Sequence, residues 1–436
     1  MKTVDGWVEV KIRDIIESSM PGEWGLDGNP EDGIPVLRST NFRNNGTIDY
    51  SDIAYRKVKK EQLNKRLIER GTILIEKSGG SPSQPAGRVV YCDCDFNGTA
   101  SNFIEVVKVK GDFSSQYIAY LLYYLYQIGL VLKYQQQTTG IINFKLNDYW
   151  EEKVNCPSSK PEQTKIAEVL SMVDQAIEQT EALIAKQQRI KTGLMQDLLT
   201  RGIDEHGNVR SEQTHKFKDS PLGRIPVEWE VQPLSSVVDL QVGYAFKSSW
   251  FSGYGIRLLR GENVGNGRPD WKDQKCLTDS IAIQFQDYEL SAGDLIIGMD
   301  RTFTKQGFKV SLLGDEDVPS LLVQRVGRFR PLSIPDGFMR LLIMSPAYQR
   351  ELLLQQKGMD IPHLSKSEIL SPIVPIPKST NEMTTIASRI QMFQRAEQDN
   401  AGHLQKLRSL KTALMQDLLT GRKRVTPLLK DEVITG

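Results

Sequence analysis

The chain has 436 residues, which is too long for one ordinary hydrophobic core and fits two to four compact units. Hydrophobic residues make up 39% of the chain and charged residues 25%, a composition that argues against wholesale disorder. The 55 Lys and Arg nearly balance the 54 Asp and Glu, so any surface that binds a polyanion must be local.

The cysteines and the first residues bear on the compartment. One Cys-x-Cys pair and two single cysteines match neither a disulfide framework nor a four-ligand zinc site, and they favour a reducing environment. The opening MKTVDGWVEV lacks the apolar core of a signal peptide. We therefore expect a cytoplasmic protein.

Residues 1–156 are predicted to form a first domain of short strands and a few helices. GIPVLRSTNF from Gly33 and RGTILIEKSGG from Arg70 each hold a short apolar strand. The uncharged segment FSSQYIAYLLYYLYQIGLVL, residues 113–132, is long enough to span a membrane. Its five Tyr, two Ser and two Gln instead favour a buried or half-buried core helix and no membrane contact.

Residues 157–203 are predicted to form a long helix. Its apolar residues recur at alternating steps of four and three, which is a heptad seam: Ile166, Leu170, Val173, Ile177, Ile184, Leu194 and Leu198. Polar Thr180 and Lys191 interrupt the seam, as residues that fix the register and the partner of a helix often do. Residues 204–226 are rich in Gly, Pro and polar residues, show neither helical nor strand periodicity, and are predicted to form a connector.

The rest of the chain repeats this order. KTGLMQDLLT from Lys191 returns as KTALMQDLLT from Lys411, and a second domain at 227–376 repeats the strand motifs as GIRLLRGENV and SAGDLIIGMDR. Residues 377–436 hold a second long helix and a tail, with a matching seam at Ile386, Ile390, Phe393, Leu404, Leu407, Leu414 and Leu418. We predict an α+β protein in which two mixed α/β domains form a pseudo-twofold repeat, separated by an antiparallel coiled coil.

Common catalytic motifs are absent from the sequence. It contains no GxxxxGK[ST], HExxH, GxSxG or Cys-x-x-Cys pattern, and we expect surface or capping roles for its four histidines. The Cys92–Cys94 pair is expected to be buried or at a strand edge. Asp270, Asp273 and Lys275 resemble the residues that hold Mg²⁺ in nucleases, but these carboxylates lie too close in sequence for that arrangement. We therefore expect a binding module with no catalytic residues and no metal site.

This layout resembles the specificity subunit of type I restriction-modification systems. The resemblance spans essentially the whole chain and is most specific in the two K-T-x-L-M-Q-D-L-L-T copies, in LLTRGID, and in HKFKDSPLGRIPVEWEV from His215. It implies that each domain recognises one half of a split target in double-stranded DNA, and that the helices act as a spacer. A helix from Gln163 to Thr200 would be about 57 Å long, or roughly 17 base pairs.

The resemblance also implies partners and cofactors. Two methyltransferase subunits would bring S-adenosylmethionine, and restriction (translocase) subunits would bring ATP and Mg²⁺, while this chain would bind no cofactor itself. Because the helix faces repeat almost identically, they would offer equivalent docking sites to two identical partners. The residues predicted to contact these partners are Lys191, Gln196, Asp197, Lys411, Gln416 and Asp417.

Candidate DNA contacts follow from comparing the two copies. Positions identical in both should be structural or contact phosphate, whereas differing positions in matched loops are candidates for base contacts. Arg38, Asn41, Arg260 and Asn263 belong to the first group, and we favour a role in bracing the fold. The differing loops give Lys77, Ser78, Gln84, Arg88 and Lys145 in the first domain, and Asp300, Arg301, Thr302, Lys305 and Lys357 in the second. An ordinary polar surface loop remains the alternative for all of them.

Two other functions stay open at this point. A coiled-coil adaptor would organise other proteins without binding duplex DNA. A standalone nuclease or methylase would turn over substrate by itself with Mg²⁺ or S-adenosylmethionine.

Overall fold

The computed structural model describes residues 5–81, 83–137, 141–305, 307–355 and 363–429. The chain folds into two compact units: the first unit comprises residues 1–182 and 401–436, and the second comprises residues 183–400. Both long helices are shared between the units. The domain boundaries at 156, 203, 226 and 376 therefore stay predictions.

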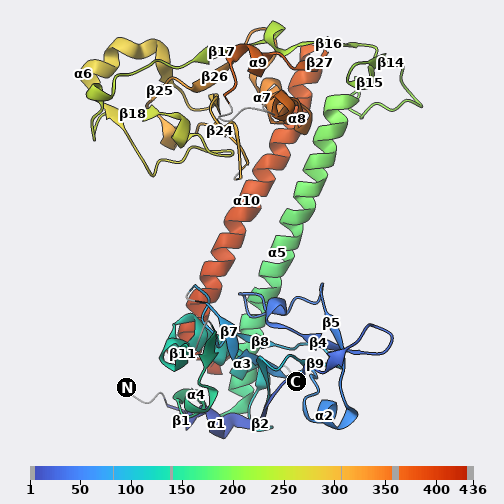
Figure 1. Cartoon of the computed structure of the whole chain (residues 1–436), viewed down its shortest axis with the longest axis vertical. Coiled ribbons are helices and arrows are strands. Elements are labelled where there is room, and N and C mark those ends of the chain that lie inside the picture. Colours follow the sequence, from blue (N-terminus) through green and yellow to red (C-terminus); the bar gives the residue numbers. More distant parts are fainter. Residues whose placement is uncertain (1–4, 82, 138–140, 306, 356–362, 430–436) are drawn as a thin grey trace. The chain divides into compact units, whose positions relative to one another are not determined.

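The first unit is a mixture of short strands and helices around the ends of two long helices (Figure 1). Its helices are α1 (Ile12–Ile15), α2 (Lys60–Lys65), α3 (Ser115–Gln127) and α4 (Leu146–Trp150). Its strands are β1 (Trp7–Lys11), β2 (Ile16–Pro21), β3 (Leu26–Asp27), β4 (Ile34–Leu37), β5 (Ala54–Lys57), β6 (Ile73–Glu76), β7 (Ser78–Gly80), β8 (Val89–Tyr91), β9 (Thr99–Ala100), β10 (Ile104–Val109), β11 (Gln135–Gln137), β12 (Ile142–Phe144) and β13 (Lys153–Pro157).

The second unit repeats this plan. Its helices are α6 (Asp279–Ala282), α7 (Asp336–Met344), α8 (Pro346–Gln355) and α9 (Lys366–Leu370). Its strands are β14 (Phe217–Ser220), β15 (Gly223–Pro226), β16 (Trp229–Pro233), β17 (Val238–Val242), β18 (Ile256–Leu259), β19 (Cys276–Leu277), β20 (Glu289–Leu290), β21 (Leu295–Gly298), β22 (Phe303–Thr304), β23 (Gly307–Phe308), β24 (Val310–Leu312), β25 (Ser320–Leu322), β26 (Val326–Pro331) and β27 (Ile373–Pro377).

One four-stranded sheet of the first unit corresponds strand by strand to one of the second. The order β2-β10-β6-β8 in the first unit matches β17-β26-β21-β24 in the second, and both sheets are antiparallel. The apolar strands β6 and β21 are buried along their whole length because each pairs on both edges inside its sheet. A glycine with positive φ precedes each of them, Gly71 at 93° and Gly293 at 92°, in a turn that residues with a side chain rarely adopt.

A pair of strands stands before each long helix: β1 pairs with β13 in the first unit, and β16 pairs with β27 in the second. Trp7 of β1 lies opposite Pro157 of β13, and Trp229 of β16 lies opposite Pro377 of β27. A long helix follows the second strand of each pair: α5 (Lys160–Thr200) and α10 (Thr380–Leu418). The two strand pairs give each helix the same starting point on its domain.

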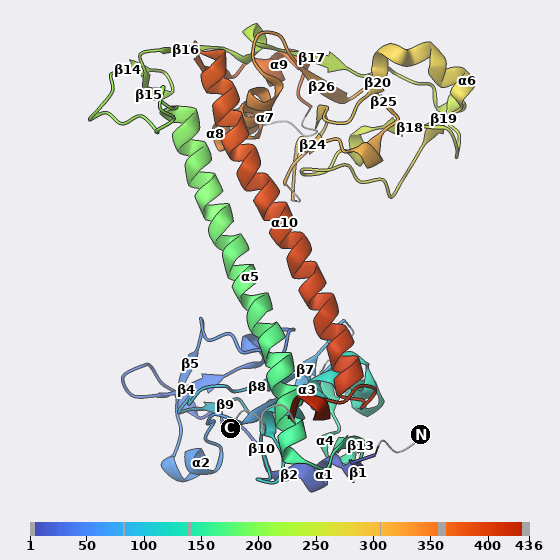
Figure 2. The same cartoon turned by 180° about the vertical axis from the view of Figure 1, so that it is seen from behind.

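The two long helices pack on each other in antiparallel fashion within each unit (Figure 1 and Figure 2). In the first unit, Glu181 of α5 pairs with Arg408 of α10. In the second unit, Gln188 of α5 donates to Glu397 of α10. The predicted α+β fold with two long paired helices is thereby confirmed, and the buried seam residues include Ile166, Leu170, Ile386 and Ile390.

The uncharged segment at 113–132 contains a core helix. Helix α3 has 13 residues, and its Tyr117, Ile118, Leu121 and Leu122 are buried in the core of the first unit. None of the helices in the described part of the chain is long and apolar enough to cross a membrane. The core-helix interpretation is confirmed.

The connector is more ordered than its composition predicts. Strands β14 and β15 form an antiparallel hairpin in which Phe217 lies opposite Pro226. Each strand has only four residues, which is too few to show an alternation of apolar and polar side chains: β14 has no buried residue, and β15 buries only its last two. Residues 204–226 thus hold a hairpin that their lack of periodicity did not indicate, and their role as a connector stays a prediction.

Candidate nucleic-acid interface

The residues that are identical in the two copies brace the fold in the same way. In the first unit, Arg38 Nη2 donates to the carboxylate of Asp52 at 2.7 Å, and Asn41 Nδ2 donates to the Asp52 carbonyl at 2.9 Å. Arg260 and Asn263 make the equivalent contacts to Asp273, both at 2.9 Å. The bracing role predicted for these four residues is confirmed.

Asp270 and Asp273, the two carboxylates that resemble a nuclease site, form hydrogen bonds within the fold. The hydrogen bond from Arg260, together with the nearby charge of Lys275, lowers the pKa of Asp273. Asp270 instead accepts from the backbone N–H of Lys272, which lowers its pKa. Among the described residues, no cluster of three or more metal-ligating side chains occurs.

The two loops that differ between the copies are held on an identical backbone frame. In the first unit, the N–H of Lys77 donates to the carbonyl of Phe103 at 2.8 Å, and the N–H of Phe144 donates to the carbonyl of Lys77 at 2.8 Å. In the second unit, Met299, Arg325 and Leu364 make the same two bonds, each at 2.9 Å. The structure thus brings the loops after β6 and β21 together with two further segments of each unit.

In the first unit, this frame gathers several of the predicted DNA contacts. Lys77 and Lys145 line a hollow of about 550 Å³ together with Gln136. Lys77 is not wholly available, since its Nζ lies 3.1 Å from the buried carboxylate of Glu105. Ser78 donates to Asn143 at 2.7 Å. Lys145 is exposed and is the most accessible cation of this group.

Gln84 and Arg88 lie elsewhere on the same unit. Gln84 Nε2 donates to Asn44 at 2.6 Å, on a neighbouring loop. Arg88 forms a two-pronged ion pair with buried Glu76, at 2.7 and 2.8 Å, and also donates to the carbonyls of Phe42 and Ser39. Because these bonds engage its whole guanidinium, the structure assigns Arg88 to bracing and corrects its place among the DNA contacts.

In the second unit, only part of the predicted set is on the surface. Asp300, Arg301 and Lys305 are at least partly exposed, but Thr302 is fully buried and donates to the Gly298 carbonyl at 2.8 Å. A buried hydroxyl cannot reach a base edge without local unfolding, so the prediction for Thr302 is corrected. Lys357 lies outside the described residues.

The residues predicted to bind partner subunits divide into two groups. Lys191 pairs with Glu397, and Lys411 lies 2.7 Å from Asp174, so both lysines act between the helices. Their place in the heptad seam explains this, and we remove them from the predicted docking surface. Gln196, Asp197, Gln416 and Asp417 are exposed or partly exposed, and the two aspartates pair with Arg201 and Lys423 on their own chain segments.

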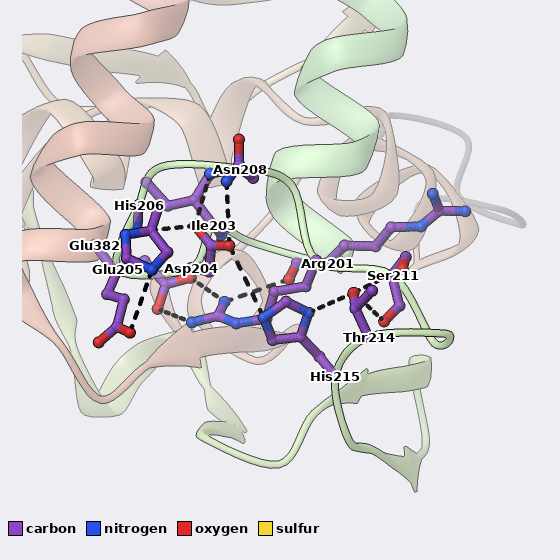
Figure 3. Close-up of polar contacts among 11 residues, drawn as sticks. Arg201, Ile203, Asp204, Glu205, His206, Asn208, Ser211, Thr214, His215 and Glu382 are labelled. Carbon is purple, nitrogen blue, oxygen red and sulfur yellow. Dashed lines mark hydrogen bonds and ion pairs between the residues drawn. The ribbon is translucent and has the colours of Figure 1, made fainter.

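A buried glutamate at the start of each long helix holds the segment that leaves the other helix. Glu382 accepts from the Ile203 N–H at 3.0 Å (Figure 3). It also accepts from Trp229 Nε1 at 3.2 Å and from both terminal nitrogens of Arg210. Glu162 accepts two bonds from Arg424 in the first unit, at 2.6 and 2.8 Å. The connector therefore begins as a fixed structure, with an Asp204 turn beside Ile203 (Figure 3).

Comparison with known proteins identifies the family. A family model described as the type I restriction modification DNA specificity domain matches residues 4–187. The type I restriction enzyme MjaVIII specificity subunit of Methanocaldococcus jannaschii is 31% identical over 311 residues, which cover 71% of each chain. The chain belongs to the type I specificity subunits. The EcoAI specificity subunit of Escherichia coli is 28% identical over 209 residues, 45% of this chain and 35% of that protein.

Solved structures agree on the fold. The crystal structure of the type I restriction-modification S subunit from M. genitalium matches with a TM-score of 0.61 at 15% identity, over 96% of this chain and 97% of that one. A chain from a structure of type I complex assembly and conformational transition matches with a TM-score of 0.54 at 14% identity, over 97% and 99% of the two chains. The specificity subunit thus shares its overall fold with both.

Two residues on the frame escaped the sequence comparison. Phe103 and Arg325 occupy the same backbone position, each at the end of a two-residue turn before a sheet strand, and both are exposed. Their spacing of 222 positions equals that of Arg38 and Arg260, so extending the repeat through Ser101–Asn102 and Val323–Gln324 could have found them.

Proposed function

We propose that each unit of this specificity subunit recognises one half of a split duplex DNA sequence. The observation that supports this most directly is the duplicated backbone frame, which holds different side chains in the two units. A scaffold kept constant beneath varied surface groups suits the recognition of two different half-sites, because base contacts depend on side chains and positioning depends on the scaffold.

We further propose that the long helices recruit two methyltransferase subunits. The repeated ten-residue motif leaves Asp197 and Asp417 partly exposed, and the residues just before it, Ile190 and Leu410, are 43% and 47% exposed. Equivalent apolar side chains beside equivalent carboxylates give two copies of one docking surface, as two identical partners require. The complete assembly would add restriction subunits.

The chemistry is assigned to those partners. S-adenosylmethionine would enter with the methyltransferase subunits, and ATP and Mg²⁺ with the restriction subunits. The sequence of this subunit carries none of the nucleotide-binding, hydrolase or metalloprotease motifs named above. Its own contribution would be selection of the sequence.

Sequencing of adenine methylation across the host genome, with and without the gene, tests the proposal. We expect one asymmetric two-part methylated motif to disappear when the gene is deleted. If the genome is unmethylated in both strains, the subunit is co-expressed with its methyltransferase and the measurement repeated. Absence of a two-part motif even then, with binding to the partner retained, would replace DNA recognition by the adaptor function.

A further inference from the structure

Three positions converge on the duplicated frame in each unit. Strand β7 pairs with β12 so that Ser78 lies opposite Asn143, and Asp300 lies opposite His363 in the second unit. The third position is the exposed turn residue, Phe103 or Arg325, whose carbonyl accepts from the residue before Ser78 or Asp300. We call each set a triad: Ser78, Phe103 and Asn143 in the first unit, and Asp300, Arg325 and His363 in the second.

In the triad of the second unit, the imidazole of His363 contacts both the carboxylate of Asp300 and the guanidinium of Arg325. His363 Nδ1 lies 2.7 Å from Asp300 Oδ1, and Arg325 Nη1 lies 3.1 Å from His363 Nε2. Arg325 Nη1 also lies 3.3 Å from His363 Nδ1, so the guanidinium contacts both nitrogens of the ring. Lys309 Nζ donates to the backbone carbonyl of Asp300 at 3.2 Å.

These contacts orient Arg325 and engage only one nitrogen of its guanidinium. Within the described residues, Arg325 makes hydrogen bonds through Nη1 alone, so Nε and Nη2 remain free for an outside acceptor. Its side chain is 54% exposed, and its φ of 75° fixes an uncommon turn that carries the side chain beside His363. The guanidinium is held at one nitrogen, and its two other nitrogens can donate to a pair of acceptors that lie in one plane.

The first unit presents different chemistry at the same three positions. Ser78 bonds to Asn143, and the third position carries the phenyl ring of Phe103, which is 49% exposed. The first unit thus offers an apolar contact where the second offers a charged donor. The two triads occupy equivalent backbone positions but carry different side chains. This is expected of two domains that recognise different half-sites.

We infer that the two triads are specificity-determining residues, with Arg325 bonding to O6 and N7 of a guanine in one half-site and Phe103 contacting a thymine methyl group in the other. This inference rests on the proposed recognition of DNA by both units. Guanine offers the acceptor pair that arginine matches best in the major groove, and the thymine methyl is the apolar group exposed there. Asp300 and His363 are positioning residues that act through Arg325.

The test uses the full chain co-expressed with its methyltransferase subunits on a plasmid library in which every base of the methylated motif is varied. Arg325→Ala should lower discrimination at one guanine about ten- to a hundredfold and leave the other half-site unchanged. Phe103→Ala should relax preference for one thymine in the opposite half-site. Arg268→Ala and Leu26→Ala change exposed residues of the second and first units outside the triads, and should leave every preference intact.

The positioning role of His363 is tested by comparing base preference in single and double variants, because a general structural defect would not be confined to one base. His363→Ala should weaken discrimination at the same guanine as Arg325→Ala, and the double variant should be no worse than Arg325→Ala alone. His363→Gln retains one acceptor and one donor, so it should restore much of the preference. Additive losses in the double variant would overturn the positioning role.

Different outcomes would contradict the role of the triads and the recognition of DNA by both units. A wild-type subunit that yields no two-part motif defeats recognition by both units. A wild-type motif that Arg325→Ala and Phe103→Ala both leave unchanged overturns the triads and keeps that function. Should Arg325→Ala abolish methylation altogether, Arg325→Gln, which keeps a polar side chain at the turn but matches adenine and not guanine, decides: selective loss at guanine supports the inference, and an unchanged motif overturns it.

Discussion

At the scale of single residues, the duplicated chain uses the same side chain for the same structural task. Glu162 and Glu382 are both buried, and each accepts hydrogen bonds from an arginine that follows the opposite long helix. Burying a carboxylate is costly unless its partners compensate, so the arginine is needed once the glutamate is present. The two pairs differ in exposure, because the side chain of Arg424 is 27% exposed and that of Arg210 only 9%.

Replacing Glu382 should therefore destabilise the second unit strongly. Glu382→Ala leaves Arg210 buried without its counter-charge and removes acceptors from Ile203 and Trp229, so we expect a loss of about 3–5 kcal/mol in the free energy of unfolding. Urea unfolding of the purified chain, followed by tryptophan fluorescence, measures it. Glu205→Ala removes an exposed carboxylate nearby and should change the value by less than about 0.5 kcal/mol. Equal effects of the two variants would contradict this account.

At the scale of the helices, Lys191, which interrupts the seam of α5, forms an ion pair with Glu397 of α10. Burial of Glu397 opposes ionisation, but the hydrogen bonds and charge supplied by Lys191 and Gln188 outweigh it and lower the pKa of Glu397. A carboxylate with a lowered pKa contributes stability that is fully present above its unfolded pKa and is lost as the pH falls through its folded pKa. This pair should thus favour the antiparallel register at neutral pH.

The pH dependence of this pair can be isolated by comparison with Glu397→Gln. Above pH ~5, the wild-type protein should be the more stable, because the unfolded pKa of glutamate is near 4.3 and the ionised form pairs with Lys191. As the pH falls further, the difference in melting temperature between the two proteins should shrink toward zero. A difference that stays constant from pH 7 to pH 3 would show that ionisation of Glu397 does not contribute.

Exposed helix residues carry the prediction for partner binding. Reversing both charges with Asp197→Lys and Asp417→Lys should reduce co-purification of the methyltransferase subunits, since both copies of the proposed docking surface change sign. Reversal of Glu178, an exposed residue of α5 outside the repeated motif, serves as the control. Unchanged co-purification of the double variant would exclude docking beside these aspartates.

At the scale of the whole molecule, the repeat predicts how the two half-sites depend on the helices. If α5 and α10 set the spacing, removing one heptad from both should shorten the non-contacted spacer by about 10 Å, or roughly 3 base pairs, and keep the seam in register. Residues 181–187 and 401–407 are matched stretches for this deletion. Methylation sequencing should find both half-sites unaltered at a closer spacing.

Deleting residues 181–187 alone provides the control. It leaves the two seams unequal in length, so we expect loss of methylation and a lower melting temperature. A matched deletion that retained the original spacer would show that the helices do not determine it.

The sequence by itself determined the architecture, because repetition and periodicity are properties of residue order. The heptad steps and the two ten-residue copies predicted paired helices, and the strand motifs predicted two related domains. The bracing of Arg38 and Arg260 also followed, since residues kept in both copies perform the task that the copies share.

Only the tertiary structure decided which loop residues are available for recognition. Arg88 and Thr302 have side chains suited to DNA, but a buried Glu76 engages the first and the core covers the second. Arg325 and His363 lie 38 positions apart, and a backbone frame built from three segments brings them together. Long-range pairing of this kind leaves no periodic signal along the chain, so only the fold shows which of these residues lie together.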